Sequence, residues 1–119
     1  MTLIVEDDPI FSDLCEELLQ VRGYQTTTVT EGWEAMKVVA SKNRPDLILM
    51  DLQLPDITGI ETAGMLKKST THSSIPIIAM TAFRDRWNEE ACYEVGCDDY
   101  IPKPISVPRF LEKVAEHLS

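Results

Sequence analysis

Short apolar runs alternate along the chain with stretches in which apolar residues recur at helical spacing. The runs occupy residues 3–5, 47–50 and 75–80, and each ends abruptly at polar residues. Short runs that are apolar throughout are typical of strands buried on both faces. A further strand is expected around Tyr100 and Ile101. The pattern therefore predicts a sheet whose strands are covered on both sides.

Helical spacing is found between and after these runs. The apolar residues at this spacing are Ile10, Leu14 and Leu18; Ala35, Met36, Val39 and Ala40; and Phe110, Leu111, Val114, Ala115 and Leu118. Such stripes predict amphipathic helices. Asp8, which precedes Pro9, and Ser106 are expected to cap two of them. Strands and helices therefore alternate along the chain.

Turn-forming residues separate the predicted elements at Gly23, Gly96, residues 44–46 and residues 55–59. We interpret the pattern as a β/α unit repeated five times within one domain, residues 1–119. This alternation predicts right-handed crossovers and a parallel sheet with helices on both faces, which is a doubly wound α/β fold.

Composition narrows the class of protein. The formal charge of −9, from 20 acidic and 11 basic residues, opposes direct binding to nucleic acid, since that binding depends on cationic contacts to phosphates. No apolar run approaches the roughly 20 residues of a membrane span. Cys15, Cys92 and Cys97 are odd in number and form no CxxC pair, so we expect buried, reduced thiols and a cytoplasmic location.

Polar residues that could take part in binding or catalysis follow the predicted strands. Glu6 and Asp7 follow the first run, Asp51 follows the run at 47–50, Thr81 follows the run at 75–80, and Lys103 follows the last predicted strand. In parallel sheets, ligands bind beyond the carboxyl ends of the strands. We therefore expect carboxylates, a hydroxyl and an ammonium group to converge at one edge of the sheet.

These residue types suit a phosphoryl-transfer site. Glu6, Asp7 and Asp51 offer the hard oxygen ligands that Mg²⁺ prefers. A carboxylate such as that of Asp51 can act as a nucleophile, while Lys103 and Thr81 contact phosphoryl oxygens. Each residue alone has an ordinary structural interpretation as a turn, a cap or a surface charge. The functional hypothesis depends on their occurrence at successive strand ends.

Over essentially its whole length the sequence resembles the receiver domains of two-component response regulators. The matching features are the acidic pair Glu6-Asp7, the phosphoacceptor Asp51 within residues 46–55, Gly59, the switch pair Thr81-Ala82, the switch aromatic Tyr100, and Lys103-Pro104. The resemblance implies a flavodoxin-like sheet of strand order 2-1-3-4-5 and a cis Lys103–Pro104 bond.

The resemblance also implies a mechanism. Asp51 would accept a phosphoryl group from a phosphohistidine of a sensor histidine kinase or phosphotransfer protein, with Mg²⁺ held by the acidic residues and the backbone carbonyl of Gln53. Phe83 and the Gln53 side chain would flank the site and tune the phosphoryl lifetime. Thr81 and Tyr100 would change the face formed by the fourth helix, the fifth strand and the fifth helix, in a phosphorelay whose downstream partner stays open.

Several alternatives remain at this point. A Mg²⁺-dependent hydrolase with an aspartyl nucleophile would carry a second Asp where this chain has Gln53. A binding module that has lost phosphorylation would lack part of the acidic, acceptor and lysine set. We expect His72 and His117 on the surface, and Trp87 either in the core or at a partner surface. The few residues before Glu6 predict a short first strand and leave open an excised or a free-standing domain.

Overall fold

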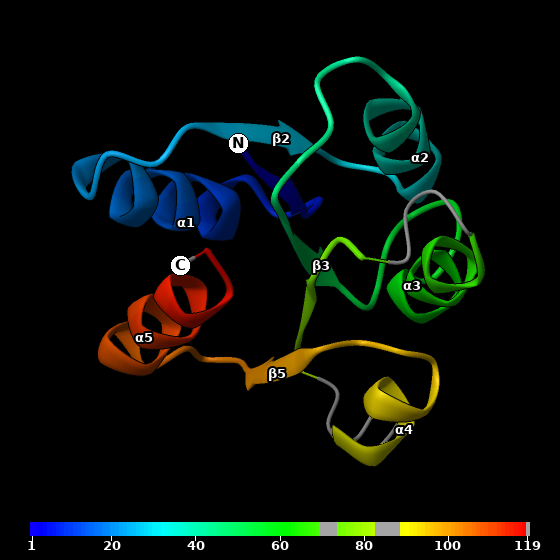
Figure 1. The fold of residues 1–119 in the computed structure, drawn as a ribbon. Helices are drawn as coiled ribbons and strands as arrows, with labels where there is room; N and C mark the ends of the chain where they lie inside the picture. The colour runs from blue at the N-terminus through cyan, green and yellow to red at the C-terminus, as the bar shows by residue number, and fades with distance from the viewer. Residues whose placement is uncertain (70–73, 83–88, 119) are drawn as a thin grey trace.

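The computed structural model describes residues 1–69, 74–82 and 89–118, and within them strands and helices alternate in ten elements. These are β1 (Thr2–Val5), α1 (Pro9–Val21), β2 (Thr26–Val29), α2 (Gly32–Ala40), β3 (Leu47–Asp51), α3 (Gly59–Lys68), β4 (Ile77–Thr81), α4 (Glu89–Glu94), β5 (Asp99–Pro102) and α5 (Val107–Leu118). Figure 1 shows this alternation along the chain. The predicted β/α repeat is confirmed.

All strands of the sheet are parallel, in the order β2-β1-β3-β4-β5. The predicted doubly wound fold and the order 2-1-3-4-5 are therefore correct. β1 is short, with four residues, but β2 and β5 have the same length. Because the strands run in one direction, their carboxyl ends share one edge of the sheet. That edge is where the sequence predicts a site.

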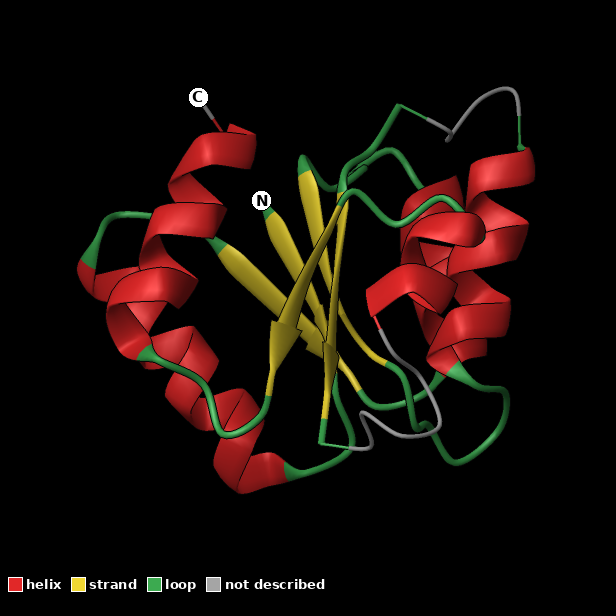
Figure 2. Cartoon of the chain, turned by 90° about the horizontal axis from the view of Figure 1, so that it is seen from below, coloured by secondary structure: helices red, strands yellow, loops and turns green. Residues whose placement is uncertain are grey.

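Helices cover both faces of the sheet (Figure 2). Side chains alternate across each strand, so Ile48 and Met50 of β3 enter the core cluster on one face, while Leu47 and Leu49 enter the cluster on the other. The first cluster includes residues of α2, α3 and α4, and the second includes residues of α1 and α5. Burial on both faces explains why the strands are apolar throughout.

Helix α1 is confirmed, but its buried face is not the stripe that the spacing predicts. Ile10 is 83% exposed and Leu14 is 39% exposed, whereas Cys15 and Leu19 are fully buried. Four residues turn an α-helix by about 400°, so a strict four-residue spacing drifts around the helix by about 40° per step. The first turn of the helix fixes its rotation about its own axis and so determines which residues face the sheet. The spacing of apolar residues does not predict that rotation.

Cys15, Cys92 and Cys97 are free and buried, as predicted. Burial raises the pKa of Cys15 to about 12, that of Cys92 to about 11 and that of Cys97 to about 12. The thiolate is the reactive form of cysteine, so these thiols are inert at neutral pH.

A charged cluster lies at the amino end of β5, away from the predicted site. The Asp99 carboxylate pairs with the ammonium of Lys113, and its other oxygen lies 3.1 Å from Nε2 of His117. His117, which was expected on the surface, is partly exposed: its side chain is 22% exposed and contacts Asp99. Burial of Asp99 favours the neutral acid, but its hydrogen bonds, first that from Lys113, hold its pKa below the ordinary value.

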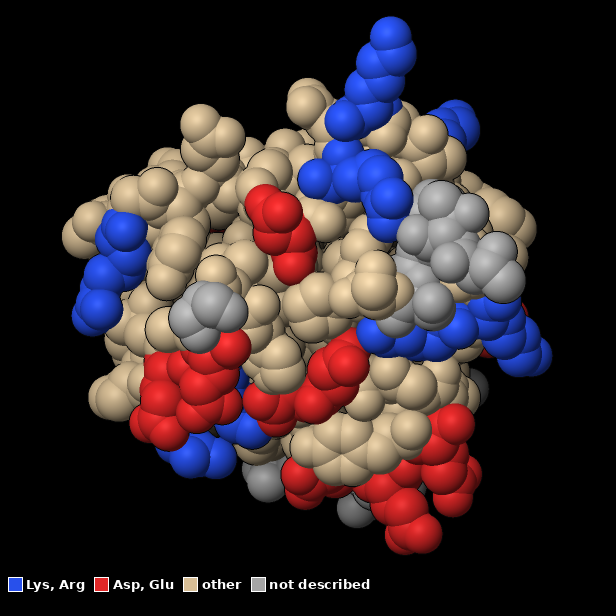
Figure 3. Space-filling model, viewed as in Figure 1, with Lys and Arg blue, Asp and Glu red and all other residues tan. Residues whose placement is uncertain are grey.

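No helix in the described part of the chain is both long and apolar enough to cross a lipid bilayer. On the face shown in Figure 3, the basic side chains of the described residues lie in separate groups among acidic ones.

Candidate functional site

Three carboxylates meet where β1 and β3 end. Val5 and Met50 are paired in the sheet, so the residues that follow them, Glu6 and Asp51, are brought side by side. One carboxylate oxygen from each of Glu6, Asp7 and Asp51 can be chosen so that all lie within 4.8 Å of one another. The sequence prediction that these residues converge is correct in its geometry.

Glu6 is the most deeply buried member of this acidic cluster, with 1% of the residue exposed. Its Oε1 lies 2.6 Å from Nζ of Lys103, and its Oε2 accepts a hydrogen bond from the backbone N–H of Asp8 at 3.1 Å. Burial raises the pKa of Glu6, the Lys103 ammonium lowers it, and the neighbouring Asp51 raises it further, with a net upward shift. Glu6 is therefore held in place by two donors although its charge is costly there.

Asp7 lies at the open side of the cluster and is exposed. Its pKa is raised, first by desolvation and then by its neighbour Glu6. Desolvation is the largest cause of both upward pKa shifts, and repulsion between the carboxylates adds to it; a positive charge placed between them would offset both effects. The acidic cluster therefore favours occupation by a cation.

Asp51 ends β3 and is 6% exposed. Its Oδ1 accepts a hydrogen bond from the backbone N–H of Gln53 at 3.3 Å and lies 3.6 Å from Nζ of Lys103. Gly59 approaches the same strand end so closely that a Cβ there would lie 1.9 Å from the carbonyl oxygen of Asp51. Only glycine fits this approach, which explains its position in the sequence.

Two residues of the loop after Asp51 cap helices: Thr58 caps α3 and Asp56 caps α2. The side chain of Thr58 accepts a hydrogen bond from the backbone N–H of Glu61, which caps α3. Asp56 caps α2 from a distance: its carboxylate accepts hydrogen bonds from the backbone N–H groups of Gly32 at 2.9 Å and Trp33 at 3.0 Å. The loop that carries Gln53 is thereby tied to two helices.

Lys103 directly follows β5, and its backbone N–H donates a hydrogen bond to the carbonyl of Thr81 at 2.8 Å. The Lys103–Pro104 peptide bond is cis, as the resemblance implies. The ammonium group reaches Glu6 and Asp51 and also lies 4.2 Å from the centroid of the Phe11 ring. Lys103 thus has contacts on two carboxylates and one aromatic face.

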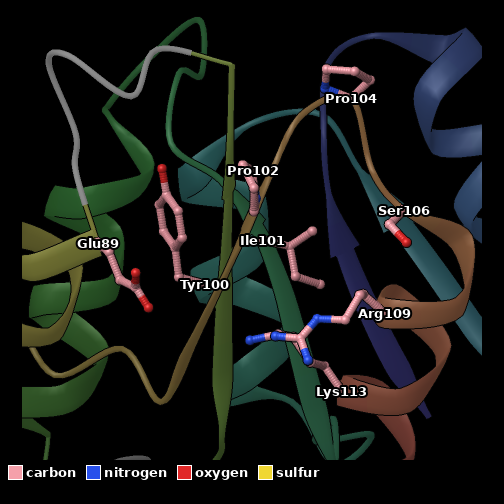
Figure 4. Close-up of a pocket in the computed structure, with 8 residues that line it drawn as sticks. All are labelled: Glu89, Tyr100, Ile101, Pro102, Pro104, Ser106, Arg109 and Lys113. Carbon is pink, nitrogen blue, oxygen red and sulfur yellow. The ribbon is translucent and has the colours of Figure 1, made fainter.

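Thr81 ends β4 and is fully buried, and Tyr100 on the neighbouring strand is 7% exposed. Beside Tyr100 lies a cavity of about 480 Å³ that is also lined by Ile101, Arg109 and Lys113. Figure 4 shows Tyr100 and Ile101 on opposite sides of β5, with the two basic side chains reaching in from α5. The face between α4 and α5 is therefore hollowed next to Tyr100.

The donor set suits a hard divalent cation. All its side-chain ligands are carboxylate oxygens, and they are grouped within the range that one small ion can bridge. The side chain of Gln53 is exposed, and the metal-binding role that the resemblance implies for this residue uses its backbone carbonyl.

Two features of the site were not predicted from the sequence: the Phe11 contact with Lys103 and the capping of α2 by Asp56. The T-x-x-E pattern of Thr58 and Glu61 was a capping signal that the sequence did contain. Phe83, Trp87 and His72, to which the sequence analysis assigned roles or positions, lie outside the described residues.

Comparisons with known proteins agree on one family. The model of the response regulator receiver domain matches residues 2–115. The polar-differentiation response regulator DivK of Brucella anthropi is 44% identical over 98% of this chain and 94% of its own length. The structure of a response regulator from Chloroflexus aurantiacus superposes with a TM-score of 0.92 at 30% identity, covering 98% of this chain and 95% of that one.

A further relative carries a metal ion. The receiver domain of a sensor histidine kinase from Pseudomonas aeruginosa PAO1 is 30% identical, with a TM-score of 0.88 and coverage of 98% of this chain and 95% of that one. Its structure has a magnesium ion coordinated in the active site cleft. From the matched family, the shared fold and the converging strand ends, we conclude that this chain belongs to the response regulator receiver domain family.

Proposed function

We propose that Asp51 is the residue of this receiver domain that accepts the phosphoryl group. The observation that carries the proposal is the position of its carboxylate at the end of β3, beside Glu6 and Asp7 and 3.6 Å from Nζ of Lys103. A nucleophilic carboxylate needs neighbours that neutralise an incoming anionic group while leaving its own oxygen accessible. Lys103 supplies one such charge.

The proposed transfer exchanges one bond to phosphorus for another. An Asp51 oxygen attacks the phosphorus of a phosphohistidine, the P–N bond breaks and a P–O bond forms. The imidazole nitrogen leaves with the electron pair of the broken bond and takes up a proton. The product is an aspartyl phosphate, and its slow hydrolysis, in which water attacks phosphorus and regenerates the Asp51 carboxylate, resets the domain.

Glu6, Asp7, Asp51 and the backbone carbonyl of Gln53 would hold Mg²⁺. When bound, the cation supplies positive charge next to the phosphoryl oxygens. Two observations support this ligand set: the acidic cluster within 4.8 Å, and the magnesium ion in the related Pseudomonas aeruginosa receiver. The backbone N–H of Asp8 orients the Glu6 carboxylate within this cluster.

Lys103 and Thr81 would bind the phosphoryl oxygens from the side of β4 and β5. The backbone hydrogen bond between them keeps the two residues adjacent at the strand ends. A phosphoryl group carries roughly −1.5 to −2 charges and strong acceptor oxygens, so it attracts both the ammonium and the hydroxyl. Part of the signal therefore passes through Thr81.

Tyr100 would transmit the change to the face between α4 and α5. The structure shows its ring in a buried position within the core cluster that also contains Ala79 of β4. We propose that phosphorylation stabilises this inward position by drawing Thr81 toward Asp51. The phosphoryl group can shift the population only by contacts that differ between the two states.

This chain would act in the cytoplasm, and its partners would be a sensor histidine kinase or phosphotransfer protein and a downstream protein or domain that recognises the switched face. An aspartyl hydrolase would need an acid or base at position 53, where this chain has the exposed amide of Gln53. The whole segment of residues 1–119 would act as one receiver domain.

The test is phosphorylation by a small phosphodonor in the presence of Mg²⁺, followed by intact-mass measurement. We expect the wild type to gain the mass of one phosphoryl group and Asp51→Asn to gain none. Lys113→Gln, on α5 and paired with Asp99 instead of the acidic cluster, is the control and should be labelled like the wild type. Equal labelling of Asp51→Asn would eliminate the assignment.

A further inference from the structure

The ammonium of Lys103 has a contact that the phosphoryl-transfer chemistry does not explain. Its Nζ lies 4.2 Å from the centroid of the Phe11 ring, while Glu6 and Asp51 approach it with carboxylate oxygens. A cation at this distance over an aromatic face is attracted by the ring quadrupole. Phe11 is on α1, so this contact joins the first helix to the residue after the last strand.

The position of the Phe11 ring is fixed by the way α1 begins. Asp8 caps the helix by accepting a hydrogen bond from the backbone N–H of Ile10 at 3.0 Å, and Pro9 occupies the first turn. Phe11 then packs against the core cluster formed by α1, α5 and the sheet, which includes Phe110. The ring is therefore anchored in the core cluster beside the ammonium end of the Lys103 side chain.

The β1–α1 segment holds the ammonium in two chemically different ways. Glu6 binds it as an anion at 2.6 Å, and Phe11 binds it as a neutral π-surface. A metal ion or a phosphoryl group changes the charges around Glu6 and Asp51, but it does not change the ring. The ring therefore remains available to the ammonium when the electrostatic partners of Lys103 are exchanged.

Lysine has a flexible stem, and ordering it costs rotamer entropy. The Lys103 side chain is 17% exposed, so it has access to solvent when its partners weaken. A fixed contact that keeps Nζ near Asp51 lowers the entropy that must be lost when the ammonium meets a phosphoryl oxygen.

We propose that Phe11 is a positioning residue that keeps the Lys103 ammonium over the phosphoacceptor site by a cation–π contact. This inference rests on the proposed function in one respect, the contact of Lys103 with the phosphoryl group. Phe11 touches neither the phosphoryl group nor its donor in this role. It acts through Lys103, and it accelerates both formation and hydrolysis of the aspartyl phosphate, because the ammonium stabilises both transition states.

The contact is tested first without any phosphorylation. In protein labelled with ¹³C at the lysine ε-carbons, the protons next to the Lys103 ammonium should resonate upfield because of the Phe11 ring current. Phe11→Leu should remove this shift, and Lys103→Arg identifies the signal. A Lys103 signal with the same shift in Phe11→Leu would overturn the contact, whatever becomes of the acceptor assignment.

The energetic role is tested by replacing Phe11 with 3,4,5-trifluorophenylalanine, which keeps the shape of the ring and weakens its quadrupole. With a small phosphodonor and Mg²⁺, we expect both phosphorylation and dephosphorylation to slow by about three- to tenfold, the size of a partly desolvated cation–π contact. Phe11→Trp should restore near-native rates, since indole binds cations best. The same fluorinated residue at Phe110, fully buried in the same core cluster, is the control and should change neither rate.

Two kinetic outcomes would overturn the proposal. Faster hydrolysis in Phe11→Leu, with unchanged rates in the fluorinated variant, would mean that Phe11 only shields the site from water. Unchanged rates together with a lost ring-current shift would mean that the contact does not position the ammonium for transfer. If Asp51 is not the acceptor, the Asp51→Asn protein is still labelled, so failure of the proposed function is recognised separately.

Discussion

The cap that Asp56 provides to α2 leads to a quantitative prediction about stability. Its carboxylate accepts hydrogen bonds from the N–H groups of Gly32 and Trp33, whereas Glu31, at the N-cap position of the same helix, makes no capping hydrogen bond with its side chain. Asp56→Ala removes the acceptor of two N–H groups, and loss of an N-cap costs about 0.5–2 kcal/mol. We expect a loss at the upper part of that range, about 1–2 kcal/mol, because the N–H of Gly32 is partly buried.

Two further variants separate the charge from the hydrogen bond. Asp56→Asn keeps an acceptor oxygen and loses the favourable interaction of a negative charge with the helix dipole, so it should cost about 0.3–1 kcal/mol. Glu31→Ala is the matched control, with the same charge change at the same helix end, and should stay within about 0.5 kcal/mol of the wild type. The measurement is urea unfolding, with the midpoint and the m-value fitted separately.

The pH dependence of this difference follows from the pKa of Asp56. Slight burial raises it, but hydrogen bonds from the N–H groups of Trp33, Ile57 and Gly32 hold it below the ordinary value of 3.8. A lowered carboxyl pKa contributes stability above the unfolded value, and this contribution is lost as the pH falls through the folded value. The gap between wild type and Asp56→Ala should therefore be full at neutral pH and shrink below 3.8. A Glu31→Ala loss as large as that of Asp56→Ala would refute this reasoning.

Three other outcomes are expected. Mg²⁺ at ten times its dissociation constant should stabilise the wild type by about 1.4 kcal/mol, and the thermal shift should be smaller in Asp7→Asn; equal shifts would place the ion elsewhere. Lys113→Met should cost about 2–4 kcal/mol in urea unfolding because it leaves Asp99 buried without its ammonium partner, yet phosphorylation should proceed at the native rate. Thr81→Ala should accept phosphate but show reduced amide NMR shifts around Tyr100 on phosphorylation, and undiminished shifts there would speak against the hydroxyl route.

Much of the fold could be predicted because its physical signals are local. Runs such as residues 47–50 are apolar throughout since the sheet is covered on both faces, and the polar residue at each strand end is visible directly in the sequence. Parallel strands then bring those residues to one edge without further information. That is why the acidic cluster of Glu6, Asp7 and Asp51 was predictable.

Features that depend on the phase of a helix or on distant loops were not predictable. The buried face of α1 is set by how its first turn docks, so Ile10 was placed wrongly. The capping of α2 by Asp56 joins residues 24 positions apart, and the approach of Phe11 to Lys103 joins the two ends of the fold. His117 carries no local signal for its contact with Asp99.

The most direct test of the central claim is to locate the phosphoryl group on the chain. Wild-type protein is phosphorylated with a small donor and Mg²⁺, and the acyl phosphate is reduced with borohydride, which converts a phosphorylated aspartate into homoserine. Peptide mass spectrometry then identifies the converted residue. The account predicts homoserine at position 51 and unmodified aspartate at Asp7 and Asp8; conversion at another carboxylate, with Asp51 intact, would contradict it.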